Sequence, residues 1–95
     1  MKLTIIPHTG TVNIDGVSYN NIDLSFMDST IHAVQWKETQ GEIERWDPAL
    51  GKIIANEPIT EINQFQQAID LWKSKDAEYK AQQAAIEQFL AQQNS

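Results

Sequence analysis

The feature that most constrains the fold is an uninterrupted helical pattern in the last third of the chain. Residues 61–92 contain no Gly or Pro, and Ala, Gln, Glu, Lys and Leu, which are good helix formers, dominate the segment. Thr60 is a favourable N-cap residue, and Glu61 places a negative charge at the positive end of the helix dipole. The sequence therefore predicts one long helix over residues 60–92.

Large side chains along this helix are spaced alternately three and four residues apart, which is the spacing of a coiled-coil seam. We expect the first part of this seam to pack on the chain's own sheet and the part after Asp76 to be held less firmly. The seam consists of Ile62, Phe65, Ile69, Trp72, Asp76, Tyr79, Gln83, Ile86 and Leu90, with Phe89 beside it.

The expected helix is longer than a small sheet can cover. About thirty residues at 1.5 Å each span roughly 45 Å, whereas strands of ordinary length are much shorter. The last turns must therefore project, bend back or meet another chain. Ile86, Phe89 and Leu90 are too apolar to be left in water without a reason, so a frayed tail, self-association and binding of a partner all stay open.

The front of the chain, residues 1–56, has the pattern of short antiparallel strands. Lys2–Ile6 is rich in β-branched residues, and Pro7 ends it because proline lacks an N–H for the ladder. Thr11–Ile14 and Val17–Tyr19 flank Asp15-Gly16, a pair that tolerates positive φ at both turn positions. A tight hairpin is expected there.

Two further apolar groups extend this pattern. Ile22, Leu24 and Phe26 alternate with polar residues, and they predict either a short strand or an extended segment packed on the sheet. A turn at residues 47–52 precedes a short strand at Ile53 and Ile54. The chain is thus expected to be one α+β domain, a small antiparallel sheet of hairpins followed by a long C-terminal helix, because 95 residues can close only a single core.

Residues 31–46 predict the central hairpin of the sheet. If Gly41 takes the left-handed position of a three-residue loop, Val34 lies opposite Trp46, and Trp36 and Trp46 share one face. A two-residue loop at Gln40-Gly41 would place the two indoles on opposite faces. We favour the first register.

The charge balance excludes some classes of partner. Seven basic and thirteen acidic residues give a net charge of −6, the wrong sign for neutralising phosphates of nucleic acid or an anionic lipid surface. No stretch is long enough to cross a bilayer, and the N-terminus is too briefly apolar for a signal peptide. The absence of Cys fits a reducing compartment. We expect no nucleic-acid partner and no membrane association.

Residues that could carry chemistry lack the spacing that chemistry needs. His8 and His32 are the only histidines and form no metal-binding motif; we expect His8 to be exposed and His32 to be partly buried. Glu42 and Glu44 share a strand face, but a solvated face beside Lys37 explains them more simply than an acid–base pair. The four glycines are scattered singly, so they make no phosphate-binding loop. We expect no enzyme activity, no cofactor and no metal.

Candidate functional residues are therefore those that could contact another polypeptide. The aromatic residues fit core positions best, but an exposed Trp would be a binding hot spot, with Trp46 or Trp72 the first candidates. The candidate partner-binding residues are Trp36, Trp46, Trp72, Tyr79, Ile86, Phe89 and Leu90.

Residues 31–48, 56–60 and 65–72, which comprise a Trp-containing hairpin, an Asn-Glu-Pro-Ile-Thr turn and a helix start, resemble small tail-associated proteins of tailed bacteriophages. These include tail fibre assembly factors, or chaperones. The resemblance covers under half of the chain, and the opening residues 1–20 resemble such proteins less distinctively.

The resemblance implies a protein that assists folding, trimerisation or attachment of a fibre polypeptide, with no catalytic residue to carry over. It implies action in the host cytoplasm during assembly, with the virion tail as a second location. A homo-oligomer formed through the C-terminal helix is compatible with that role. The alternative function is a small acidic phage-encoded inhibitor of a host defence or regulatory protein.

Overall fold

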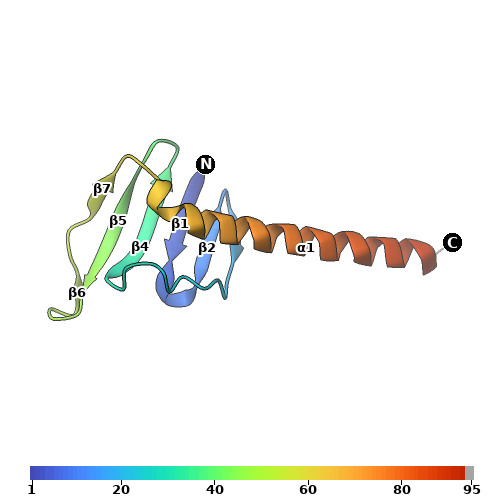
Figure 1. Cartoon of the computed structure of the whole chain (residues 1–95), viewed down its shortest axis with the longest axis horizontal. Helices are drawn as coiled ribbons and strands as arrows, with labels where there is room; N and C mark the ends of the chain where they lie inside the picture. The colour runs from blue at the N-terminus through green and yellow to red at the C-terminus, as the bar shows by residue number, and fades with distance from the viewer. Residues whose placement is uncertain (94–95) are drawn as a thin grey trace.

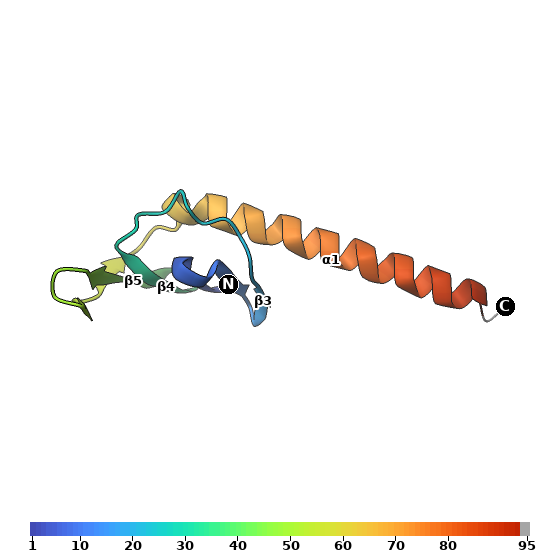
Figure 2. The same ribbon diagram turned by 90° about the horizontal axis from the view of Figure 1, so that it is seen from below.

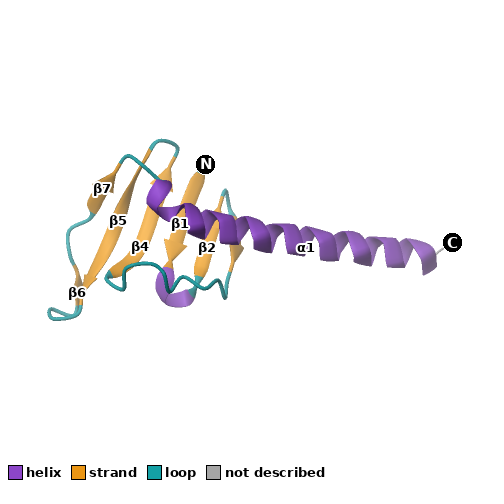
Figure 3. Ribbon diagram, viewed as in Figure 1, coloured by secondary structure: helices purple, strands orange, loops and turns teal. Residues whose placement is uncertain are grey.

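The computed structural model describes residues 1–93 and shows an antiparallel sheet followed by one long C-terminal helix (Figures 1 and 3), which confirms the predicted α+β fold. The strands are hydrogen-bonded in the order β3-β2-β1-β4-β5-β6, and β7 also pairs with β5. The elements are β1 (Lys2–Ile6), η1 (Pro7–Thr9), β2 (Thr11–Ile14), β3 (Val17–Tyr19), β4 (Ile31–Lys37), β5 (Gln40–Asp47), β6 (Lys52–Ile53), β7 (Glu57–Ile59), η2 (Asn63–Phe65) and α1 (Gln66–Gln93).

The first three strands follow the sequence pattern. Strand β1 ends at Ile6, just before Pro7, and Asp15 and Gly16 form the turn between β2 and β3 with φ values of 51° and 89°. Residues 22–26 do not form a strand. Ile22 and Leu24 are buried against the sheet, as the extended apolar alternative predicts, but the prediction is wrong for Phe26, which lies in a turn and is 40% exposed.

The β4–β5 hairpin differs from both expected registers. Lys37 pairs with Gln40 and Trp36 pairs with Gly41, so the turn is Glu38-Thr39, and Glu38 takes the left-handed conformation with φ of 57°. Gly41 lies within the strand, where a Cβ atom would clash with the carbonyl oxygen of Gln35 and sit 2.9 Å from the Trp36 ring. This glycine is therefore needed for packing beneath the indole and not for the turn.

The prediction that both indoles share a face is wrong. Trp36 lies in the core with 7% exposure, whereas Trp46 is 40% exposed. Trp36 pairs with Gly41, so these two positions lie on the same face of the sheet. Trp46 follows Gly41 by an odd number of residues along β5, and successive residues of a strand point to opposite faces, so Trp46 lies on the other face.

A β-bulge explains a second difference. The β4–β5 register shifts between Ile31 and Ala33, so His32 is the extra residue of the bulge. The expected partial burial of His32 is therefore wrong: its side chain is exposed, and its ring centroid lies 6.3 Å from that of Trp46.

The core lies on one face of the sheet. Figure 2 shows that the start of α1 and the segment before β4 cover the same face. The sheet contributes rows of paired apolar residues, such as Ile14, Leu3 and Trp36 across β2, β1 and β4. The buried apolar residues are Leu3, Ile5, Val12, Ile14, Ile22, Leu24, Ile31, Ala33, Val34, Trp36, Ile43, Phe65, Ala68 and Ile69.

The helix begins later than predicted. Strand β7 pairs with β5 and keeps the chain extended to Ile59, and its Pro58 is tolerated because the strand lies at an edge. Thr60 is therefore not the N-cap. Instead Ile62 precedes the 3₁₀ turn η2 and accepts a hydrogen bond from the backbone N–H of Phe65 at 2.8 Å.

Helix α1 runs without a break for 28 residues and projects far beyond the sheet (Figures 1 and 2). The molecule measures 62 × 28 × 18 Å, with a radius of gyration of 17.0 Å. A compact chain of this length would have a radius of gyration of about 12 Å. The C-terminal half of the helix therefore projects and does not bend back onto the sheet.

Candidate partner-binding surfaces

Most of the large apolar side chains that the structure leaves exposed gather in two groups, one at the β5–β6 hairpin and one on the projecting part of α1. We call the first group the hairpin patch: Trp46, Leu50, Ile53 and Ile54, which are 40%, 62%, 45% and 39% exposed. We call the second group the helix stripe: Tyr79, Ile86, Phe89 and Leu90, which are 52%, 51%, 59% and 51% exposed. Figure 1 shows that the two groups belong to opposite ends of the molecule.

The hairpin patch is held by backbone hydrogen bonds at the end of the sheet. Trp46 is the cross-strand partner of Ile53, so the two side chains share one face. The backbone N–H of Trp46 donates to the carbonyl oxygen of Thr30 at 2.7 Å. The carboxylate of Asp47 accepts the backbone N–H of Leu50 at 3.3 Å, which fixes the turn that carries this exposed leucine.

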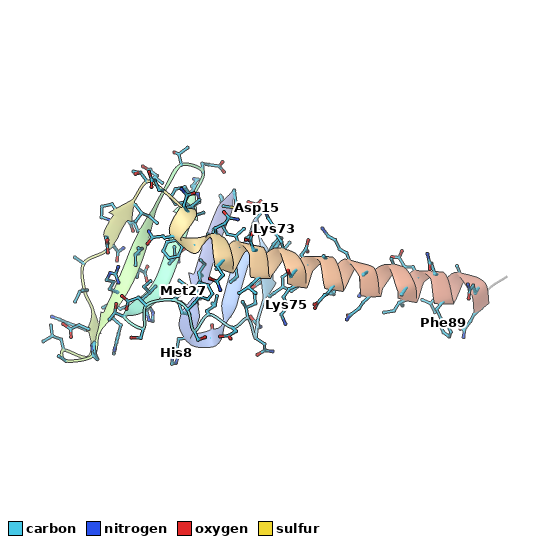
Figure 4. The ribbon with its side chains drawn as sticks, viewed as in Figure 1. His8, Asp15, Met27, Lys73, Lys75 and Phe89 are labelled. Atoms are coloured by element: carbon cyan, nitrogen blue, oxygen red, sulfur yellow. The ribbon has the colours of Figure 1, made fainter. Side chains whose placement is uncertain are left out.

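An open groove of about 990 Å³ adjoins the indole of Trp46. Its walls are η1, the segment 21–29 and the start of β4, and Trp46 also lines it. Figure 4 labels His8 and Met27 on two of these segments. The groove is of mixed character, because polar residues such as His8 and Asp23 line it together with Ile22, Leu24 and Ile31, whose side chains are almost fully buried.

Arg45 holds the segment before β4 against β5. Its guanidinium lies 2.9 Å from a carboxylate oxygen of Glu57 and 3.6 Å from one of Asp28, and it donates to the hydroxyl oxygen of Thr30 at 3.0 Å. The backbone N–H and the hydroxyl of Thr30 donate to Asp28, and with Arg45 they lower the pKa of the Asp28 carboxyl. The ion pairs of Arg45 therefore help to hold the 21–29 wall of the groove in place.

The helix stripe begins where the sheet ends, at a junction between β3 and α1. The hydroxyl of Tyr19 donates to Asp76 Oδ1 at 2.7 Å, and Lys80 Nζ lies 2.8 Å from the other carboxylate oxygen. The hydrogen bond to Asp76, with burial and the negative charge, raises the pKa of Tyr19 to about 12. The bonds from Lys80 and from Tyr19 lower the pKa of Asp76. Asp76, which occupies a seam position just before the helix stripe, is therefore a charged residue held by Tyr19 and Lys80.

An aromatic cluster completes the junction. The indole N–H of Trp72 donates to the carbonyl oxygen of Val17 at 2.9 Å, and its ring meets Tyr19 edge-on with centroids 5.7 Å apart. The Tyr79 ring lies 6.2 Å from Tyr19. Trp72 is therefore a half-buried residue that anchors the helix on the edge strand, and Tyr79 is the last stripe residue in contact with the sheet.

Every residue from 77 to 93 is exposed. In Figure 4 Phe89 extends from the end of α1 that lies far from the sheet. Because the stripe keeps the three-and-four spacing of Phe65, Ile69 and Trp72, which pack on the core, it continues the same side of the helix that the sheet covers.

The predicted site residues therefore fall into three environments. Trp36 is buried and donates its indole N–H to the carbonyl oxygen of Glu38 at 3.1 Å, so it belongs to the core. Trp72 lies at the junction, while Trp46 and the helix residues are exposed. Sequence patterns gave no sign of the groove. For the Tyr19–Asp76 hydrogen bond, the signal in the sequence was a charged residue, Asp76, at a seam position of the helix.

The residues considered for chemistry lie apart. His8 is exposed in η1, as predicted, and Glu42 accepts a hydrogen bond from the side-chain amide of Asn56 at 2.8 Å. Within residues 1–93, no three residues of the His, Cys, Asp or Glu type gather as metal ligands would. The described part of the chain also contains no helix with the length and apolar character of a membrane span.

Compared with models of protein families, with curated proteins and with solved structures, the chain has no match.

Proposed function

We propose that this chain acts by binding another polypeptide, and that the partner is a tail or tail-fibre polypeptide of a tailed bacteriophage whose assembly it assists. The observation that carries the proposal is the exposed indole of Trp46 beside Ile53, in a molecule whose core does bury Trp36. Trp is enriched at the centres of protein interfaces, where its removal costs more than that of most residues. The phage identity of the partner rests on the sequence resemblance alone.

The hairpin patch and the adjoining groove suit an extended segment of the partner. The indole and Ile53 offer an apolar anchor, and the polar residues Asn21, Asp23 and Ser25 are among those of the segment 21–29 that line the groove. Binding of this kind needs no cofactor. We place the interaction in the host cytoplasm during assembly, with retention in the virion tail as the further possibility to be examined on purified particles.

Co-expression with the fibre polypeptide encoded nearest to this chain tests the proposal. We expect a soluble complex that co-purifies, and we expect Trp46→Ala to weaken it about thirtyfold, the loss typical of a hot-spot residue. Val17→Ala is the matched control, because Val17 is 45% exposed at the opposite edge of the sheet. Failure to capture any tail polypeptide, or equal capture by the Trp46 variant, would count against the proposal.

The acidic-inhibitor alternative predicts a different result. The purified chain would then retain a host protein in a manner that falls steeply with ionic strength, because the attraction would come from its net charge of −6. Its gene would also lie outside a tail-gene cluster.

A further inference from the structure

We infer that the helix stripe is covered by the same stripe of a second copy of this chain, in antiparallel orientation. This inference goes beyond the proposed function and does not depend on the identity of the partner held by the hairpin patch. It rests on the extent of the exposed helix, on the position of the sheet relative to the stripe and on the placement of three charges.

The exposed part of the helix has the length and composition of a short pairing segment. Residues 80–93 span about 21 Å at 1.5 Å per residue. Their only charged residues are Lys80 and Glu87, so the segment is neutral although the whole chain carries −6. Two copies can therefore pair through these segments without the electrostatic repulsion that acts between the acidic remainders of the two chains.

The position of the sheet selects the orientation. The sheet already covers the seam side of α1 as far as Tyr79, where the ring contact with Tyr19 ends the tertiary packing. In a parallel pair the two seams would face each other along the whole helix, and both sheets would have to occupy the space between the helices. In an antiparallel pair each helix covers its partner only beyond the sheet, and the two sheets lie at opposite ends of the shared rod.

The antiparallel register covers the apolar residues of the stripe. Placing Leu90 opposite the partner's Tyr79 also places Ile86 opposite the partner's Gln83, and the two-fold axis repeats both layers. Phe89, beside the seam, then lies over the stem of the partner's Gln82. All four stripe residues are covered by this overlap.

The flanking charges support the same register. In the antiparallel pair Lys80 meets the partner's Glu87, an attraction that the symmetry repeats. In a parallel pair in the same register Lys75 would meet the partner's Lys80, and Glu87 would meet only Gln82. The charges therefore favour the antiparallel arrangement and oppose the parallel one.

Sedimentation equilibrium of the full chain over a concentration series tests the inference. We expect the mass to rise from 10.8 kDa toward twice that value. Ile86→Glu should weaken the association by more than about tenfold, because it buries a charge at the centre of the overlap. Ala84→Glu is the matched control on the opposite side of the helix and should change the association little. Circular dichroism should show that both variants keep their helix.

Charge exchange distinguishes the two orientations. Glu87→Lys should weaken an antiparallel dimer by about tenfold, because it turns the attraction to the partner's Lys80 into a repulsion, and it leaves the ion pair of Lys80 with Asp76 within the chain in place. If the pair were parallel, Glu87→Lys would change the association little, because Glu87 would meet only Gln82. A monomeric mass at every concentration, association insensitive to Ile86→Glu, or association insensitive to Glu87→Lys would each overturn the inference.

These outcomes are separate from those of the proposed function. A helix variant that stays monomeric but still captures a fibre polypeptide would leave the hairpin patch as the binding surface. If instead the monomeric wild-type chain captured a fibre polypeptide and Ile86→Glu abolished that capture, the stripe would belong to the fibre and the self-pairing would be refuted.

Discussion

The two halves of α1 share one sequence pattern but differ in what surrounds them. Residues 66–79 place Ile69 and Trp72 against the sheet, whereas residues 80–93 carry Ile86 and Leu90 at the same spacing into solvent. Helix formation alone cannot tell the halves apart, because both are built from good helix formers. The comparison shows that a periodic apolar pattern indicates a helix face that needs a covering surface. The pattern does not indicate whether the same chain or another molecule supplies that surface.

The largest expected effect comes from a matched pair of substitutions. Ile69 is 4% exposed, so Ile69→Ala should lower the free energy of unfolding by about 3 kcal/mol and Tm by about 15 °C. Ile86→Ala should change it by less than about 0.5 kcal/mol at concentrations where the chain is monomeric. Thermal unfolding followed by circular dichroism measures both. Equal losses would mean that the projecting half is packed after all.

A smaller effect is expected at the junction between the halves. Tyr19→Phe removes the hydrogen bond to Asp76 but keeps the ring that contacts Trp72, so Tm at neutral pH should fall by a few degrees. Tyr79→Phe is the matched control and should change Tm little.

The difference in Tm between wild type and Tyr19→Phe should depend on pH in a defined direction. In the folded chain the pKa of Tyr19 is raised above its ordinary value of 10.0 to about 12, so its contribution is complete below pH 10 and is lost as the pH rises toward 12. The pKa of Asp76 is lowered below its ordinary value of 3.8, so its contribution is complete above that value and is lost as the pH falls below it. The difference in Tm between wild type and Tyr19→Phe should therefore become smaller at both low and high pH. A Tm difference that is constant from pH 3 to pH 11 would contradict the hydrogen bond between Tyr19 and Asp76.

The smallest effect on stability should follow removal of the projecting half. A chain ending at Lys80 keeps Asp76, Tyr79 and their contacts with Tyr19, so its free energy of unfolding should lie within about 0.5 kcal/mol of the intact monomer. Its helical signal should nevertheless fall, because residues 81–93 belong to α1. A chain ending at Trp72 is the control, since it loses the junction and should be clearly less stable. A large loss on cutting at Lys80 would erase the distinction between the halves.

Most of the fold follows from local sequence, and its exceptions have physical causes. The β2–β3 turn was predictable because Asp15-Gly16 supplies positive φ, and the helix was predictable from its periodicity. The β4–β5 turn was not, because a glycine required by a turn and a glycine required by packing look alike in sequence. Gly41 serves the packing of Trp36, and Glu38 takes the left-handed conformation that the propensities disfavour.

The candidate site was predictable only in part. The helix stripe could be read from spacing, and Trp46 could be nominated as an exposed aromatic. Strand β7 was not predicted because proline is unfavourable within most strands, although an edge strand such as β7 tolerates Pro58. The groove depends on η1, the segment 21–29 and the bulge at His32, which only the tertiary fold brings together.

The distribution of the three tryptophans makes the molecule its own optical probe. Trp36 is shielded in the interior, Trp72 is half covered, and Trp46 is open to solvent. Quenchers in solution should therefore reach mainly the emission of Trp46, and any ligand seated on the hairpin patch should protect that emission. Residues 80–93 contain no Trp, so pairing through α1 should leave the fluorescence spectrum almost unchanged. A quenching measurement can thus report occupation of the hairpin patch without interference from pairing through α1.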